Sequence, residues 1–207
     1  MIKKLIIMPF RLRKNHKRIA IIAVIVAILL GAVYWAWLSV SRRVPEEFLV
    51  ARKNAADVSQ KIVRLTSDTN TKIKDINISE LSGNPDEAIS FIKEARASNN
   101  EAYNQAFELA RNLQKLAESL KNFRSEESQR LAYEAVAVEL ALVSEFIVYT
   151  QHLNRFFDSL TKVVATDSFA DRRSVEESLK DVNREVIVIN SLNKEFVSKI
   201  KAFDDSL

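Results

Sequence analysis

Apolar residues recur at alternating spacings of three and four positions through most of the chain beyond residue 43. Such spacing places its members on one face of an α-helix, and a long stripe of this kind requires a partner helix. The chain also has only two glycines and three prolines in 207 residues, so it offers few turns and favours long helices over sheets. The longest unbroken stripe, apolar at all but one position, comprises Ile92, Ala95, Asn99, Ala102, Ala106, Leu109, Leu113, Leu116, Leu120 and Phe123.

Breaks in the pattern divide it into four helices. Gly83 and Pro85 lie between the first and second, and residues 166–173 form a predicted loop before the fourth. We therefore expect an all-α fold, with one N-terminal transmembrane helix followed by an elongated antiparallel four-helix bundle. The expected bundle helices are about 45–78, 86–123, 126–165 and 171–205. Between the second and third, only a shift of the pattern and Ser125, a candidate N-cap, indicate a turn. The alternative is therefore a three-helix rod with one long continuous central helix.

Two features of the predicted helices go beyond a simple apolar stripe. Residues 135–148 are apolar on most sides, which indicates burial on more than one face. Polar residues occupy three positions in the stripes, which we call the polar seam positions: Thr69, Asn99 and Asn193. A polar residue at such a position usually fixes the register of packed helices at some cost in stability.

Residues 19–40 form an apolar segment of 22 positions without a charge. As a helix it is about 33 Å long, close to the roughly 30 Å hydrocarbon core of a bilayer. Tyr34, Trp35 and Trp37 lie near its end, where aromatic rings settle at the lipid headgroups. We interpret the segment as an uncleaved signal anchor, because the apolar region of a cleaved signal peptide is shorter and ends at a small-residue site.

Small residues at four-residue spacing lie on one face of this segment: Ala23, Ala27 and Gly31. Such a face lets two transmembrane helices approach closely, so it is a candidate pairing face. Alanine is also common in transmembrane helices, so the alternative is that the spacing reflects composition and not pairing.

Residues 1–18 form a basic tail that includes Lys14, Lys17 and Arg18. By the positive-inside rule, we expect the N-terminus to be cytoplasmic and residues 44–207 to form an extracytoplasmic helical bundle. The protein is then a single-pass membrane protein, in the cytoplasmic membrane if the host is bacterial, and the lipid bilayer is one of its partners.

The charge distribution argues against nucleic-acid binding. Residues 1–43 hold nine of the 31 basic residues and none of the 27 acidic ones, so residues 44–207 have 22 basic and 27 acidic residues, a formal net charge of −5. A nucleic-acid-binding domain needs a basic face. The chain has no cysteine, which excludes disulfides and thiolate metal sites.

The sequence contains few groups suited to catalysis. Beyond the basic tail there is one histidine, His152, which shares a predicted helix face with Glu145 and Tyr149. A carboxylate-bridged metal site in a bundle needs paired Glu-x-x-His elements, which this chain lacks. No glycine-rich phosphate loop is present. We therefore expect no enzyme activity, no cofactor and no metal.

These observations favour a membrane-anchored helical interaction or structural module of the cell envelope, which binds a protein partner or itself through helix faces. Such a module should expose an apolar patch, with candidates at Phe91, Tyr103, Phe157 and Phe169. The alternative is an extracytoplasmic four-helix-bundle sensor or ligand-binding domain that signals through a partner protein, with its pocket near the polar seam positions.

Overall fold

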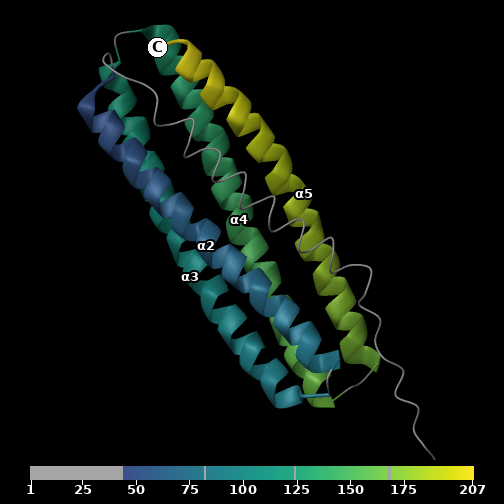
Figure 1. Cartoon of the computed structure of the whole chain (residues 1–207). Coiled ribbons are helices and arrows are strands. Elements are labelled where there is room, and N and C mark those ends of the chain that lie inside the picture. Colours follow the sequence, from purple (N-terminus) through teal and green to yellow (C-terminus); the bar gives the residue numbers. More distant parts are fainter. Residues whose placement is uncertain (1–43, 82, 124, 167–168) are drawn as a thin grey trace, which may run out of the picture.

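The computed structural model describes residues 44–81, 83–123, 125–166 and 169–207. They form four long α-helices that run the full length of the molecule (Figure 1). The helices are α2 (Glu46–Leu81), α3 (Pro85–Ser119), α4 (Glu126–Thr166) and α5 (Phe169–Asp205). A single 3-10 turn, η3 (Leu120–Asn122), follows α3.

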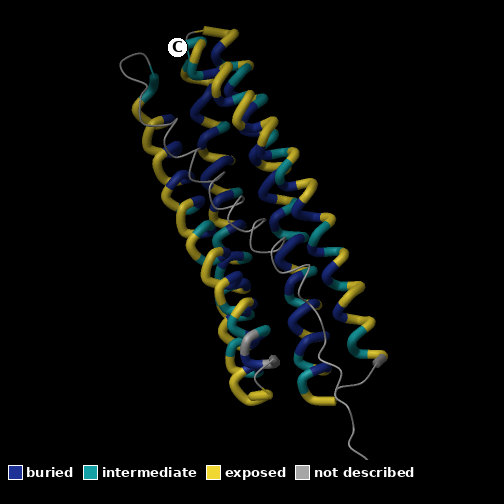
Figure 2. The backbone as a smooth tube through the Cα atoms, turned by 45° about the vertical axis from the view of Figure 1, so that its right-hand side comes forward, coloured by how far each residue is buried: buried dark blue, intermediate teal, exposed yellow. Residues whose placement is uncertain are grey.

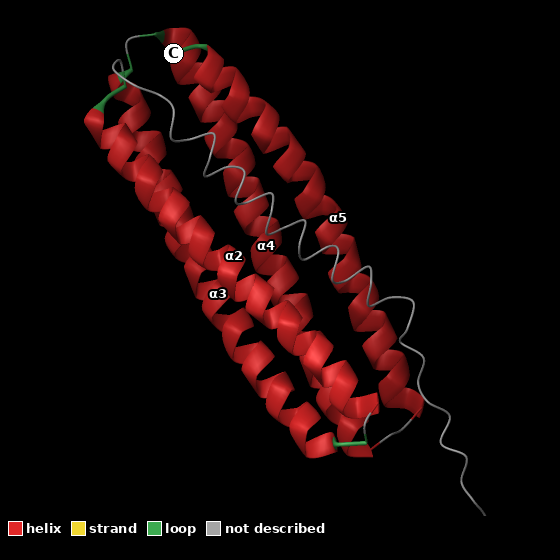
Figure 3. Ribbon diagram, in the orientation of Figure 1, coloured by secondary structure: helices red, strands yellow, loops and turns green. Residues whose placement is uncertain are grey.

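Each helix packs antiparallel against the next one in the chain (Figure 3). The expected all-α fold of four antiparallel helices is therefore confirmed. The alternative, a rod with a continuous central helix, is wrong, because the chain leaves the helical conformation after η3. Phe123 there is extended, with a ψ of 140°. The Ser125 side chain then accepts a hydrogen bond from the Ser128 amide at 3.2 Å, which caps the start of α4.

The turn between α2 and α3 is built from the residues that the sequence offers for it. Gly83 has a positive φ of 73°, a conformation that glycine adopts at little cost. The Asn84 side chain accepts a hydrogen bond from the Glu87 amide, and Pro85 occupies the first helical position, where no amide donor is needed. The Ser79 hydroxyl donates to the Glu87 carboxylate at 3.0 Å and joins the two helix ends.

The core is a continuous column between the helices. In Figure 2 the buried residues follow the inward side of each helix and the exposed residues follow the outward side. Each inward stripe keeps the spacing of three and four that the sequence predicts, because only this spacing keeps a helix face in contact with its neighbours over many turns. The core members of α3 and η3, from Ala88 to Leu120, are almost completely buried.

Several predictions fall on residues outside those that the structure describes. They concern the basic tail (Lys14, Lys17, Arg18), the aromatic residues at the end of the apolar segment (Tyr34, Trp35, Trp37) and the candidate pairing face (Ala23, Ala27, Gly31). Within residues 44–207 as described, no helix is both long enough and apolar enough to cross a bilayer.

Candidate functional site

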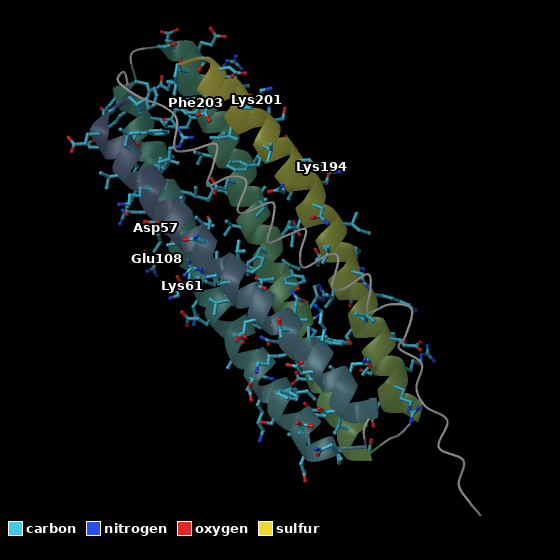
Figure 4. All side chains as sticks on the ribbon, in the orientation of Figure 1. Asp57, Lys61, Glu108, Lys194, Lys201 and Phe203 are labelled. Atoms are coloured by element: carbon cyan, nitrogen blue, oxygen red, sulfur yellow. The ribbon has the colours of Figure 1, made fainter. Side chains whose placement is uncertain are left out.

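One end of the bundle is closed by a cluster of three phenylalanines. Phe48 of α2 meets Phe123 edge to face, with ring centroids 5.0 Å apart. Phe203 of α5 lies 5.7 Å from Phe48 and 5.8 Å from Phe123. Figure 4 labels Phe203 at this end of α5. The cluster therefore ties the first turn of α2, the connection after η3 and the last turns of α5 together.

A buried ionic group lies next to this cluster. The Arg52 guanidinium, almost fully buried, donates to the Asp204 carboxylate, with Nη2 to Oδ1 at 3.2 Å. Burial lowers the pKa of Arg52 and raises that of Asp204, and their mutual attraction opposes both changes. Burial also raises the pKa of Glu139 of α4 to about 8, against the attraction of Arg52. This group lies beside Phe48 and Phe203, and its ion pair links α2 with α5.

The three polar seam positions are all buried, but their polar atoms are satisfied differently. The Thr69 hydroxyl donates to the Leu65 carbonyl of its own helix at 2.9 Å. Asn99 of α3 reaches α4, where its amide donates to the Thr150 carbonyl at 2.8 Å and to the Asn154 side chain at 3.0 Å. Neither amide atom of Asn193 has a hydrogen-bond partner within the described residues.

The face that carries His152 is a polar contact between α4 and α5. The two ring nitrogens of His152 lie 3.8 Å from carboxylate oxygens of Asp181 and Glu185. The pKa of Glu145 is raised by burial, by hydrogen bonding to Glu185 and by repulsion from it. In the part of the chain that the structure describes, no set of His, Asp or Glu side chains is arranged to hold a metal ion. Arg184, 3.1 Å from Asp181, balances part of the negative charge.

An open hollow of about 540 Å³ lies between the start of α2 and the end of α3. Its lining mixes the acidic side chains Glu46, Glu47 and Glu118 with Lys115 and Lys121. Side chains of both signs along a shallow surface are typical of a solvated helix pair, and none of the polar seam positions lines this hollow.

The expected apolar patch lies elsewhere than predicted. Phe157 is completely buried, so its assignment to the surface was wrong. Phe91 is half-buried under the Lys72 ammonium, 5.3 Å from its ring centroid, and the side chain of Phe169 lies outside the described residues. Tyr103 is half-buried and meets Phe107 edge to face, and Phe107 is 43% exposed.

The outward side of α4 carries two of the exposed large apolar side chains in the described part of the chain. Residues 135–148 are apolar on most sides, and the structure covers the inner side only. Tyr133 is 43% exposed and Leu140 is 38% exposed. Ile147 is half-buried, while the remaining outward positions Ala137, Ser144 and Gln151 are small or uncharged and exposed. We call these six residues the outer stripe: Tyr133, Ala137, Leu140, Ser144, Ile147 and Gln151.

Tyr103 and Phe107 of α3 extend this surface toward one side. They lie three and seven positions after Asn100 in the sequence. The Asn100 side chain accepts a hydrogen bond from the Asn154 side chain of α4 at 2.9 Å. Residues at spacings of three and four share a helix face, so both rings lie on the α4 side of α3.

The outward sides of the other helices differ because they carry charges along their length. Figure 4 shows Asp57 and Lys61 on α2, Glu108 on α3, and Lys194 and Lys201 on α5. All five are exposed. Ile187 of α5 is the most exposed large apolar side chain among those described, at 71%, and Val188 and Val197 of the same helix are also exposed. The outer stripe differs from the charged positions of these helices because none of its six residues is charged.

Comparison of the chain with models of known protein families, with curated proteins and with solved structures finds no match in any of the three.

Proposed function

We propose that the protein is a membrane-anchored, non-catalytic interaction module of the cell envelope. In this proposal residues 19–40 span the bilayer, the N-terminal tail is cytoplasmic and the four-helix bundle lies on the far side of the membrane. The uncharged length of the apolar segment and the excess of basic residues before it support the topology. The proposed function rests on a surface for a protein partner and not on a reaction.

The observation that carries the proposal is the outer stripe of α4. A helix of a monomeric bundle normally presents charged and polar side chains to water, and the exposed residues Asp57, Lys61, Lys194 and Lys201 of α2 and α5 follow this rule. Leu140 and Tyr133 instead remain exposed at the middle and one end of an uncharged stripe. Contiguous apolar surface of this kind marks protein–protein contact sites.

Site-specific photo-crosslinking tests the surface. A photoreactive amino acid at position 140, introduced into the full chain in its native membrane, should form a covalent product with a protein. The matched control is position 67, because Ser67 is exposed on the outward side of α2. A product from position 140 and none from position 67 is the expected result. Equal yields from both positions, or none from either, would contradict the proposal.

A separate experiment tests the topology. A reporter enzyme that is active only outside the cytoplasm, fused after Leu207, should be active. Replacing Lys14, Lys17 and Arg18 by glutamine should lower that activity, because these charges keep the tail on the cytoplasmic side. If a second reporter, active only in the cytoplasm, is the one that works after Leu207, the bundle does not lie on the far side of the membrane.

A further inference from the structure

Glu139 of α4 is a buried carboxyl group that borders a small apolar cavity. The residue is 6% exposed, and its Oε2 atom has no hydrogen-bond partner within the described residues. The cavity has a volume of about 10 Å³, and its largest lining side chains are Phe48 of α2 and Phe196, Ile200 and Phe203 of α5. A space of this size has room for about one water molecule. The closed bundle can therefore hydrate an ionised Glu139 only poorly.

Two charged groups on neighbouring helices bear on this carboxyl group. Arg52 of α2 attracts Glu139, and the same guanidinium donates to the Asp204 carboxylate of α5 at 3.2 Å. The described residue of α3 that lines the cavity is Leu116, which has no charge. One guanidinium therefore serves two carboxyl groups on different helices, and an ionised Glu139 would compete with Asp204 for it.

The charge balance of these three groups depends on the proton of Glu139. With Glu139 protonated, the Arg52 cation and the Asp204 anion cancel. Loss of the proton gives the three groups a net negative charge in a region of low dielectric constant, which is unfavourable unless water reaches it. Burial therefore favours the protonated carboxyl group and raises the pKa of Glu139 to about 8.

The last turns of α5 are the segment that would have to move to admit water. Three of the large side chains that line the cavity come from these turns, and one comes from α2. Asp204 lies on the same turns and is already partly hydrated. When Glu139 is ionised, Asp204 loses part of its attraction to Arg52. The same ionisation thus weakens the contact that holds in place the segment covering the carboxyl group.

We propose that Glu139, Arg52 and Asp204 form a pH-sensitive latch, which holds residues 196–205 of α5 against α2 and α4 and releases them as Glu139 loses its proton. The detached state stays a minority, because it exposes three large apolar side chains to water. Its population, however, rises with pH. This inference goes beyond the proposed function and does not depend on the outer stripe of α4 binding a partner.

The direction and size of the response follow from the two pKa values of Glu139. The pKa is about 8 in the closed state and near 4.5 when the side chain is exposed. The stabilisation of the closed latch is therefore fully present below pH 4.5 and is lost as the pH rises toward 8. The population of detached molecules should increase about tenfold per pH unit between pH 5 and pH 8, and then level off.

Two buried serines at opposite ends of α4 allow a direct test, because the native chain has no cysteine. Ser128, at the latch end, is 2% exposed and accepts a hydrogen bond from the Ser206 hydroxyl at 3.1 Å. Ser159, at the other end, is 7% exposed and shares a hydrogen bond with Ser174 of α5. Each is replaced by cysteine in the full chain in detergent, and its reaction with a thiol reagent is measured. Dividing by the rate of the exposed Ser67→Cys removes the pH dependence of the thiol itself.

Between pH 6 and pH 8 the relative rate of Ser128→Cys should rise by about a hundredfold, whereas that of Ser159→Cys should change little. Adding Glu139→Gln should remove most of the rise at position 128, because glutamine fills the same space and cannot ionise. Glu145→Gln is the matched control and should keep the rise, since Glu145 is another α4 carboxyl group with a raised pKa.

Three results would overturn the proposal. A rate at position 128 that does not change with pH would show that the latch does not open. Equal increases at positions 128 and 159 would show that the bundle opens as a whole. A rise that persists in Glu139→Gln would show that another group is the sensor.

Hydrogen exchange of the native chain gives a second measurement that needs no substitution. After correction for the intrinsic pH dependence of exchange, the amides of residues 196–205 should exchange faster at pH 8 than at pH 6, and those of residues 170–180 should not. An equal change in both segments, or no change in either, would contradict the latch. Photo-crosslinking from position 140 is unaffected by these outcomes, so the inference and the proposed function can fail separately.

Discussion

Arg52 in the second turn of α2 and Asp204 at the end of α5 form an ion pair across 152 positions of sequence, with Nη2 to Oδ1 at 3.2 Å. The Arg52 side chain is almost completely buried, whereas Asp204 keeps part of its carboxylate in water. The Arg52 guanidinium also lies 5.9 Å from the ring centroid of Phe48. The pair therefore holds the first and last helices of the bundle together at one end.

Removing Asp204 should destabilise the bundle. Asp204→Asn leaves a buried guanidinium with a weaker partner, and we expect the free energy of unfolding to fall by about 2 kcal/mol. This is less than the roughly 3–5 kcal/mol typical of a fully buried pair, because Asp204 is partly hydrated. Chemical denaturation of the full chain in detergent, followed by circular dichroism, measures the change. Asp205→Asn, at the exposed neighbouring position, is the control, and an equal cost there would contradict this account.

Glu139 should make stability depend on pH. Burial raises its pKa to about 8 in the folded chain, whereas an exposed glutamate titrates near 4.5. The folded state therefore holds this proton more tightly than the unfolded state, so its contribution is fully present below pH 4.5. That contribution falls as the pH rises toward 8, by several kcal/mol, since each pH unit is worth about 1.4 kcal/mol. Asp204 and Glu145, whose pKa values are also raised, act in the same direction.

Glu139→Gln isolates this effect. The variant keeps the shape of the side chain without its titration, so its unfolding free energy should change much less between pH 5 and pH 8. It should also exceed that of the native chain at pH 8. If the variant retained the full pH dependence, the titrating group would have to be another one.

Asn193 and Asn99 form a matched pair for testing buried polar groups, because each is 2% exposed. Asn193→Leu removes two amide atoms that have no partner in the described chain, and we expect an unfolding free energy higher by about 1 kcal/mol. Asn99→Leu removes two hydrogen bonds to α4, one to the Thr150 carbonyl and one to the Asn154 side chain, so it should cost about 1–3 kcal/mol. Thermal and chemical unfolding should show a higher stability for Asn193→Leu and a lower stability for Asn99→Leu than for the native chain.

Gly83 provides a test confined to the backbone. Its φ of 73° is unfavourable for a residue with a Cβ, although the added atom would meet nothing within 4 Å. Gly83→Ala should therefore lower the unfolding free energy by about 1 kcal/mol through backbone strain alone. Gly83→Asn should cost less, because asparagine tolerates this conformation better. Equal costs would indicate a cause other than the dihedral angle.

The helical part of the fold could be predicted from local patterns. The alternation of three and four positions identifies a packed face, and Gly83, Pro85 and Ser125 supply the turns and caps where the chain reverses. Residues that form one helix face are close in sequence, so no knowledge of distant contacts is needed. The break at Phe123 had the weakest signal, because no glycine or proline accompanies it.

Contacts between distant residues could not be predicted in this way. No local pattern pairs Arg52 with Asp204 or shows that the Asn99 amide reaches the Thr150 carbonyl. Phe157 was assigned to the surface, but the bundle buries both Phe156 and Phe157. The apolar run at 135–148 predicted burial on more than one face, but the sequence could not show that Leu140 stays exposed in the described chain.

The meeting of Phe48 with Phe203 at one end of the bundle determines how the molecule would respond to mechanical force. An even number of antiparallel helices returns the chain to the end where α2 begins (Figure 1). Tension between residue 45 and residue 207 would therefore act on these two rings and on the Arg52–Asp204 pair first. The helices would peel apart one turn at a time instead of sliding along their whole length, so the fold would give way under a small load.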